Sequence, residues 1–374
     1  MRSHGKKTIV LLLIATISFS ILLPHDGPLA SPVYNATDTD AVSCSIAVSN
    51  EDIRISSRLL ELLLGKGSSE DNDILLIPGG MIFGARIKQS YVTVSDPGEI
   101  KELKCGDKII SVNGQSVHSG KEIQEIIHSS QGGEIDVVYK RGEKTASTKI
   151  QSHSENGEYK IGISLKEGAA GIGTITYIDA KTGLFGGLGH GICDPDTAEP
   201  VEMCEGDVCG VILGGVKKGE AGKPGELSGI LTDKSCGVIY SNTECGIFGK
   251  LDEIPASTTL TPVKMGHKEE VHTGSATILS TVKMGACKKF DIEITEINKN
   301  STGTKSFKIK VTDPTLIAIT GGVVRGMSGS PIIQDGKLIG AVTHVMVANP
   351  TEGYGIFIDN MLSASQQSIQ PKAA

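Results

Sequence analysis

Residues 157–359 consist of short apolar segments separated by glycine-rich turns, and this pattern constrains the fold more than any other feature. No stretch here shows more than two turns of helical periodicity before residues 359–366. The whole chain has 47 Gly and no Trp among its 374 residues. Regularly spaced short strands with turn signals between them predict a β-barrel or a β-sandwich. The apolar segments are 172–178, 211–213, 238–240, 275–282, 307–311 and 316–320.

The first 30 residues have the layout of an export signal. Basic residues from Arg2 to Lys7 precede an apolar run over residues 8–23, which is the order that export signals show. The run is slightly shorter than the roughly 20 residues that span a bilayer. We therefore expect residues 1–30 to direct export, either as a cleaved signal or as a membrane anchor through residues 8–23. Residues 31–73 are expected to form a tether and a short helix.

A separate unit is marked by turn signals within residues 74–152. A Gly-Asp pair at 106–107 leads into an apolar strand, and the Asn-Gly pair at 113–114 is typical of a two-residue hairpin turn. A helix is expected over residues 121–128. Together these features resemble the best-marked part of a PDZ domain, which we expect to occupy residues 74–152.

A PDZ domain takes up an extended peptide as an added strand and captures its terminal carboxylate with backbone N–H groups. Glycines at the groove entrance let the backbone approach the ligand closely. The resemblance therefore predicts that Gly79, Gly80 and Gly84 bind the peptide.

The hexapeptide Gly-Met-Ser-Gly-Ser-Pro at 326–331 carries the strongest chemical signal. It precedes two apolar strands joined by an Asp-Gly turn, and it looks like the nucleophile loop of chymotrypsin-like peptidases. A serine hydroxyl is a weak nucleophile, so it needs a base to take its proton and N–H donors for the developing oxyanion. By resemblance, Ser328 is the nucleophile, and the N–H groups of Gly326 and Ser328 form the oxyanion hole.

His190 is the best candidate for the base. It stands between Gly189 and Gly191, which give it little packing and suit an orientable catalytic side chain. It also precedes Ser328, which is the chain order of the chymotrypsin clan. His344 follows the hairpin and is another histidine that could lie near Ser328. The third group should be a carboxylate that orients the imidazole, and sequence alone leaves several candidates: Asp194, Asp196, Asp252, Asp291 and Asp313.

Taken together, these motifs resemble the SpoIVB family, the PDZ-containing serine peptidases of endospore-forming bacteria. The resemblance covers nearly the whole chain and rests on residues 77–80, 106–114, 170–174, 188–192 and 326–331. It implies a mostly β fold, with an N-terminal apolar helix, a PDZ domain and then a chymotrypsin-like β-barrel peptidase domain over residues 157–374. It places the Ser-His-Asp triad on Ser328, His190 and Asp313.

The resemblance also implies a role in sporulation signalling. Such a peptidase is exported across the forespore membrane into the intermembrane space, anchored at its N-terminus or released. It cleaves itself and the regulators of a membrane-embedded protease, which then activates a sigma factor. The implied partners are therefore protein substrates and a peptide or C-terminal ligand of the PDZ domain.

Other classes of function have less support. The net charge is −7 and basic residues do not cluster, so a nucleic-acid partner is not expected. The eight cysteines include no C-x-x-C pair, and no metal or cofactor is expected. Cys204 and Cys209 are the best candidates for a local disulfide. An inactive PDZ peptide-binding scaffold is the main alternative, and a metal or thiol enzyme is a more remote one.

Overall fold

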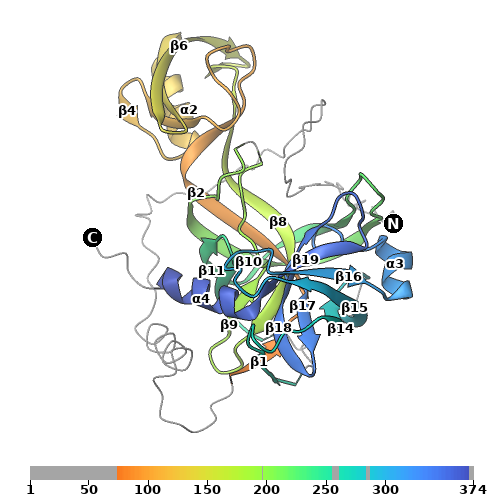
Figure 1. Ribbon diagram of the computed structural model, residues 1–374. Helices are drawn as coiled ribbons and strands as arrows, with labels where there is room; N and C mark the ends of the chain where they lie inside the picture. The colour runs from red at the N-terminus through yellow and green to blue at the C-terminus, as the bar shows by residue number, and fades with distance from the viewer. Residues whose placement is uncertain (1–73, 196, 255–260, 284–286, 370–374) are drawn as a thin grey trace, which may run out of the picture.

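The computed structural model describes residues 74–369, except 196, 255–260 and 284–286 (Figure 1). The predicted export signal, anchor and tether therefore lie outside the described residues. Within the described part of the chain, no helix is both long and apolar enough to cross a membrane.

The first β-barrel is built from strands on both sides of the PDZ sequence. Pairing runs from β2 to β8, β9, β12, β11, β10 and back to β2, so this ring of strands closes on itself. Its core includes Phe83, Phe185 and Ile247, which are buried. The strands of this unit are β1 (Leu75–Pro78), β2 (Ile82–Asp96), β8 (Ser164–Ile178), β9 (Leu184–Gly187), β10 (Met203–Lys217), β11 (Glu226–Thr243), β12 (Gly246–Leu251) and the short β13 (Val263–Lys264), which pairs with β1.

The PDZ unit is inserted into this barrel between β2 and β8. Both strands are long, and they run side by side from the barrel into the PDZ unit (Figure 1). A register shift between Lys88 and Thr93 separates the barrel half of β2 from its PDZ half. The other PDZ elements are β3 (Lys108–Val112), β4 (Gln115–Ser116), α2 (Gly120–Ser129), β5 (Gly133–Arg141), β6 (Lys144–Glu155) and β7 (Glu158–Lys160).

The local PDZ predictions are confirmed, but the expected start of the unit differs. Asn113 and Gly114 have φ of 47° and 75°, as the hairpin turn requires, and the predicted helix is α2. In contrast, β1 and residues 82–89 pair with peptidase strands. These residues precede the PDZ sequence yet belong to the barrel, because backbone pairing brings together segments that are far apart in the chain.

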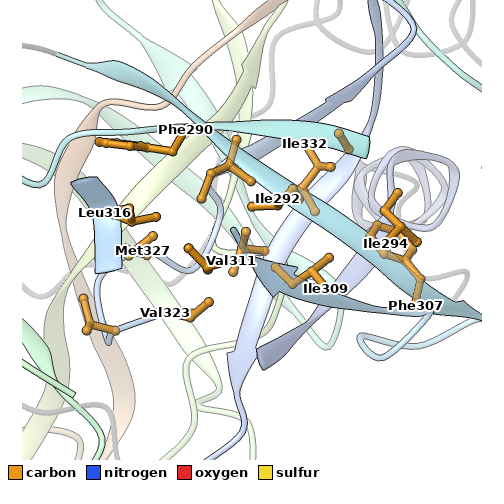
Figure 2. Close-up of a cluster of buried hydrophobic side chains, with 14 of the residues drawn as sticks. Phe290, Ile292, Ile294, Phe307, Ile309, Val311, Leu316, Val323, Met327 and Ile332 are labelled. Atoms are coloured by element: carbon orange, nitrogen blue, oxygen red, sulfur yellow. The ribbon is translucent and has the colours of Figure 1, made fainter. Parts of the chain in front are cut away.

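The second barrel closes in the order β14, β15, β16, β19, β18 and β17. Alternate residues of its strands point inward, and Figure 2 shows Phe290, Ile292, Ile309 and Val311 meeting in its core. Its elements are β14 (Gly274–Ser280), β15 (Lys288–Ile297), β16 (Phe307–Val311), α3 (Pro314–Thr320), β17 (Pro331–Gln334), β18 (Lys337–Val345), β19 (Glu352–Phe357) and α4 (Ile358–Ile369).

One predicted strand is a helix. Residues 316–320 belong to α3, although their apolar run had favoured a strand. Asp313 caps the helix through its side chain, and Pro314 occupies the first turn, where its missing N–H costs nothing. Gly321, with φ of 78°, ends the helix in the left-handed conformation.

Candidate active site

Ser328 lies in a tight loop between α3 and β17 in the second barrel. The loop is anchored by Met327, whose side chain is fully buried beside Leu316 and Val323 in the barrel core (Figure 2). Gly326 and Gly329 flank the turn with φ of 95° and 93°, a region that favours glycine. The sequence around Ser328 therefore has the conformational freedom that this loop uses.

Strand β8 of the first barrel supports the same loop from the other side. The N–H of Thr174 donates to the carbonyl of Ser328 at 2.9 Å, and its hydroxyl donates to the carbonyl of Gly326 at 2.8 Å. The hydroxyl of Thr176 donates to the carbonyl of Gly329 at 2.8 Å. These bonds turn the carbonyls of the loop toward β8.

Unlike the carbonyl groups of this loop, the N–H groups of Gly326 and Ser328 have no hydrogen-bond partner in the described part of the protein. Two neighbouring donors left unused beside a serine hydroxyl are suited to stabilise an oxyanion. Their arrangement matches the oxyanion hole expected from sequence, although that assignment stays a prediction.

His190 follows β9 in the first barrel. Its Nδ1 lies 2.9 Å from the carbonyl oxygen of Gly191. A carbonyl can only accept, so this contact places the proton on Nδ1 and leaves Nε2 as the basic nitrogen. Burial lowers the pKa of His190 below its ordinary value, so the ring is neutral and able to accept a proton at neutral pH.

The Ser328 and His190 loops pack directly against each other. A Cβ added to Gly329 would lie 2.5 Å from the backbone nitrogen of Leu188, and one added to Gly189 would lie 2.9 Å from a methyl group of Thr343. The hydroxyl of Ser328 donates to the carbonyl of Thr343 at 2.8 Å. In this conformation the Ser328 hydroxyl is therefore directed at β18, and its bond to the imidazole has still to form.

Comparison with known families decides the class of the protein. The profile of the SpoIVB peptidase S55 family matches residues 157–362, more than half of the chain. The chain belongs to the SpoIVB peptidase S55 family. A PDZ domain profile matches residues 92–141. The protein is thus a serine peptidase of this family that carries a PDZ domain, as the sequence motifs predicted.

Solved structures give distant similarities. The active form of the Rv3671c protease from M. tuberculosis is 14% identical, with a TM-score of 0.32 over 55% of this chain and 78% of that one. Its inactive form is also 14% identical, with a TM-score of 0.32 over 54% and 85%. The PDZ domain of the SdrC-like protein from Listeria monocytogenes is 26% identical, with a TM-score of 0.19 over 21% and 90%. A comparison with curated proteins returns no match.

His344 lies beside His190 in the candidate active site. Its ring centroid is 5.2 Å from that of His190, and the planes are tilted by 37°. Burial, with added repulsion from His190 and Lys305, lowers the pKa of His344 to about 3. The ring therefore stays neutral and does not compete for the proton that His190 would accept.

Asn242 is a site residue that sequence reasoning missed. Its side chain accepts from the N–H of Ile192 at 2.8 Å and donates to the carbonyls of Ile192 and Val201 at 2.9 and 3.0 Å. These bonds fix the chain just after His190. No local motif marks Asn242, because it comes from β11, some 50 residues later in the sequence.

The structure gives Asp313 a role in the cap of α3. One carboxylate oxygen accepts from the N–H groups of Thr315 and Leu316 at 2.8 and 2.9 Å. The other lies 3.5 Å from the N–H of Asp291. Of the other candidates, Asp194 forms an ion pair with Lys166 at 2.9 Å. The position beside His190 Nδ1 is taken by the Gly191 carbonyl, and the assignment of Asp313 to the triad stays a prediction.

The three glycines expected in the PDZ groove lie in the peptidase unit instead, Gly79 and Gly80 in the connection between β1 and β2 and Gly84 within β2. The N–H groups of Gly79 and Gly80 donate to carbonyls of β8, at Thr176 and Ile175. Gly84 pairs with Ile172 in β8 and faces the Cys209 thiol. These glycines therefore allow close packing in the first barrel, because the first half of β2 belongs to that barrel and only its second half belongs to the PDZ unit.

The sequence analysis also made predictions about a disulfide and about metal binding. Cys209 is a buried free thiol whose pKa burial raises to about 11, so the predicted bridge to Cys204 is not formed in this structure. Within the described ranges, no three His, Cys, Asp or Glu residues are grouped so as to hold a metal ion.

Proposed function

We propose that the protein is an exported serine endopeptidase that uses Ser328 as its nucleophile and His190 as its general base. The observation that carries this proposal is the meeting of two loops from different barrels, one bearing Ser328 and the other bearing His190 with its Nδ1 held by the carbonyl of Gly191. Membership of the S55 family gives the reaction class, and the packing of the two loops supports these roles for Ser328 and His190.

The reaction begins with a rotation of the Ser328 side chain. Its hydroxyl leaves the carbonyl of Thr343 and donates to Nε2 of His190, which takes the proton as the oxygen attacks the scissile carbonyl. The unused N–H groups of Gly326 and Ser328 stabilise the oxyanion. His190 then returns the proton to the leaving amine, and water hydrolyses the acyl-enzyme by the same route.

Two different groups could orient the His190 imidazole in the third position of the triad. Asp313 is the orienting carboxylate that the family resemblance predicts, while the carbonyl of Gly191 is the acceptor that contacts Nδ1. A carbonyl can hold the same tautomer without a negative charge. The observed contact favours a Ser-His pair oriented by Gly191, since the Asp313 carboxylate is engaged in the cap of α3.

A fluorophosphonate probe tests the nucleophile. We expect the probe to label the protein and Ser330→Ala, but not Ser328→Ala. Ser330 is a matched control because it is also a loop serine, with its hydroxyl bonded to Ser280 at 3.1 Å. Labelling of Ser328→Ala at the same rate would refute the proposal.

The cellular role is proposed from the family resemblance. We infer that the exported enzyme cleaves itself and a regulator of a membrane-embedded protease, and thereby triggers sigma-factor activation during sporulation. Self-cleavage should appear as a shortened product of the full chain that is absent from Ser328→Ala. Loss of sporulation in a strain that carries only Ser328→Ala, made at normal levels, would support the role, and normal sporulation would contradict it.

The inactive scaffold remains a second candidate because the Ser328 hydroxyl is directed at Thr343 in this conformation. A scaffold would bind peptides through its PDZ unit yet show neither probe labelling nor casein cleavage.

A further inference from the structure

The loop between β15 and β16 is held beside Ser328. The hydroxyl of Thr343 donates to the carbonyl of Thr304 in this loop at 2.8 Å. The carbonyl of the same Thr343 accepts from the Ser328 hydroxyl, also at 2.8 Å. Lys305 directly follows Thr304, so its backbone lies one residue from a contact with β18 at the candidate active site.

The side chain of Lys305 lies on the face of the second barrel that meets His190. Its ammonium group is 5.3 Å from the centroid of the Tyr354 ring. Tyr354 of β19 lies directly opposite His344 of β18, so the two rings share one face of the sheet. The His344 ring is in turn 5.2 Å from that of His190. After burial and the neighbouring His190, the charge of Lys305 also lowers the pKa of His344, as a cation on this face would.

Lys305 carries a positive charge that no carboxylate of the described residues binds. It forms no ion pair within these ranges, and its side chain is exposed. The next lysine along the chain, Lys308, is instead bound by Glu296 at 2.8 Å. Arg325, which directly precedes Gly326, likewise forms no ion pair in the part of the chain that the structure describes. Although the net charge of the chain is −7, these two side chains add unpaired positive charge near the Ser328 loop.

Lys305 is within reach of a peptide that is bound at Ser328. Contacts of about 5 Å between successive groups place the ammonium about 10–15 Å from the His190 ring. An extended peptide advances about 3.3–3.6 Å per residue. The ammonium therefore lies opposite about the third or fourth residue from the scissile bond. A carboxylate at that position of a substrate would form an ion pair with Lys305, whose exposed ammonium is open to it.

We propose that Lys305 selects substrates that carry Asp or Glu about three or four residues from the scissile bond. The lysine touches no reacting atom and acts by attracting the substrate and fixing its register on Ser328. This inference rests on the proposed catalysis by Ser328 and His190, and it specifies the class of peptide that the site takes.

The test begins with casein, whose cleavage products are identified by mass spectrometry. One cleaved segment is then synthesised with Glu, Gln or Lys at each of the four positions on either side of the scissile bond. At one of the outer positions we expect kcat/KM to be about tenfold higher for the Glu peptide than for the Lys peptide, with Gln between them. We expect this preference to shrink in about 1 M NaCl, because salt screens an exposed ion pair.

Lys305→Glu should reverse the preference, so that the Lys peptide becomes the better substrate. Lys144→Glu is the matched control, because Lys144 is an exposed lysine of the PDZ unit that also forms no ion pair among the described residues. This control makes the same change in net charge and should keep the preference for Glu. We expect the uncharged Gln peptide to be cleaved within about threefold of the parent rate by both variants.

Three results would overturn the inference. They are equal cleavage of the Glu and Lys peptides by the parent chain, a preference for Glu that survives Lys305→Glu, and an equal loss for all peptides in that variant, which would show a structural role. A parent chain that cleaves no peptide and takes up no fluorophosphonate would instead refute the proposed catalysis, and with it the selection that Lys305 is inferred to make.

Discussion

The support of the Ser328 loop by β8 makes a sharp prediction for Gly329. A Cβ at this position would lie 2.0 Å from the carbonyl oxygen of Thr174 and 2.5 Å from the nitrogen of Leu188. Both are backbone atoms, so no side-chain rotation can relieve the overlap. Gly329→Ala therefore has to displace the loop by about 1 Å to reach even the shortest tolerated contact.

The expected loss of activity follows from this displacement. A misplacement of about 1 Å in a catalytic group can cost about 100-fold in rate. Gly336→Ala is the matched control, because Gly336 also has positive φ, at 75°, but nothing lies within 4 Å of its added Cβ. We expect Gly336→Ala to lose about 1–2 kcal/mol of stability from backbone strain while keeping kcat/KM.

Casein cleavage gives kcat/KM for the two variants, and urea unfolding gives their stability. Far-ultraviolet circular dichroism is the appropriate probe of unfolding because the chain has no Trp. A Gly329→Ala protein that is folded and retains activity within about tenfold of the parent would refute the argument that β8 fixes the catalytic loop. Equal losses in both variants would refute it as well, since strain alone would then explain them.

Three further outcomes test the rest of the site. Because burial lowers the pKa of His190 and the base acts in its neutral form, the acid limb of the kcat/KM profile should fall below pH 6.5, and a limb above it would contradict the assignment. Asn242→Ala loses three hydrogen bonds to Ile192 and Val201, so unfolding experiments should show a loss of about 2–4 kcal/mol, and a neutral result would contradict this role. Asp313→Ser keeps a capping side chain, so we expect kcat to change little, whereas a drop of about 10⁴-fold would establish the triad carboxylate.

The local sequence was enough to select Ser328 and His190 as the candidate catalytic pair. Ser328 and His190 are each bracketed by glycine, and glycine at these positions has a direct structural use in the tight turns and close approach of the two loops. The PDZ hairpin and α2 were predictable for the same reason, since a turn signal and a helical period are both read within about ten residues.

The remaining features depend on pairing between distant segments. Gly79 and Gly84 lie just before a PDZ sequence, yet their hydrogen bonds and close contacts are with β8 and Cys209. The local sequence around these glycines does not indicate which strand they will contact. Asn242 was missed for the same reason. The error at α3 has a different origin. Here a local signal for a helix is present, because the Asp-Pro pair at 313–314 is typical of a helix start.

The insertion of the PDZ unit has a consequence for the order in which the chain folds. Lys88 and Gly168 are neighbours in the ladder of the first barrel but lie about 80 residues apart in sequence. Closing an unstructured loop of that length costs about 4 kcal/mol more in entropy than its constant part. A PDZ unit that folds first would bring the ends of β2 and β8 together in register and remove most of this cost. The unit would then serve as a nucleus for the barrel, so a mutation that unfolds it should slow assembly of an active site to which it contributes no catalytic residue.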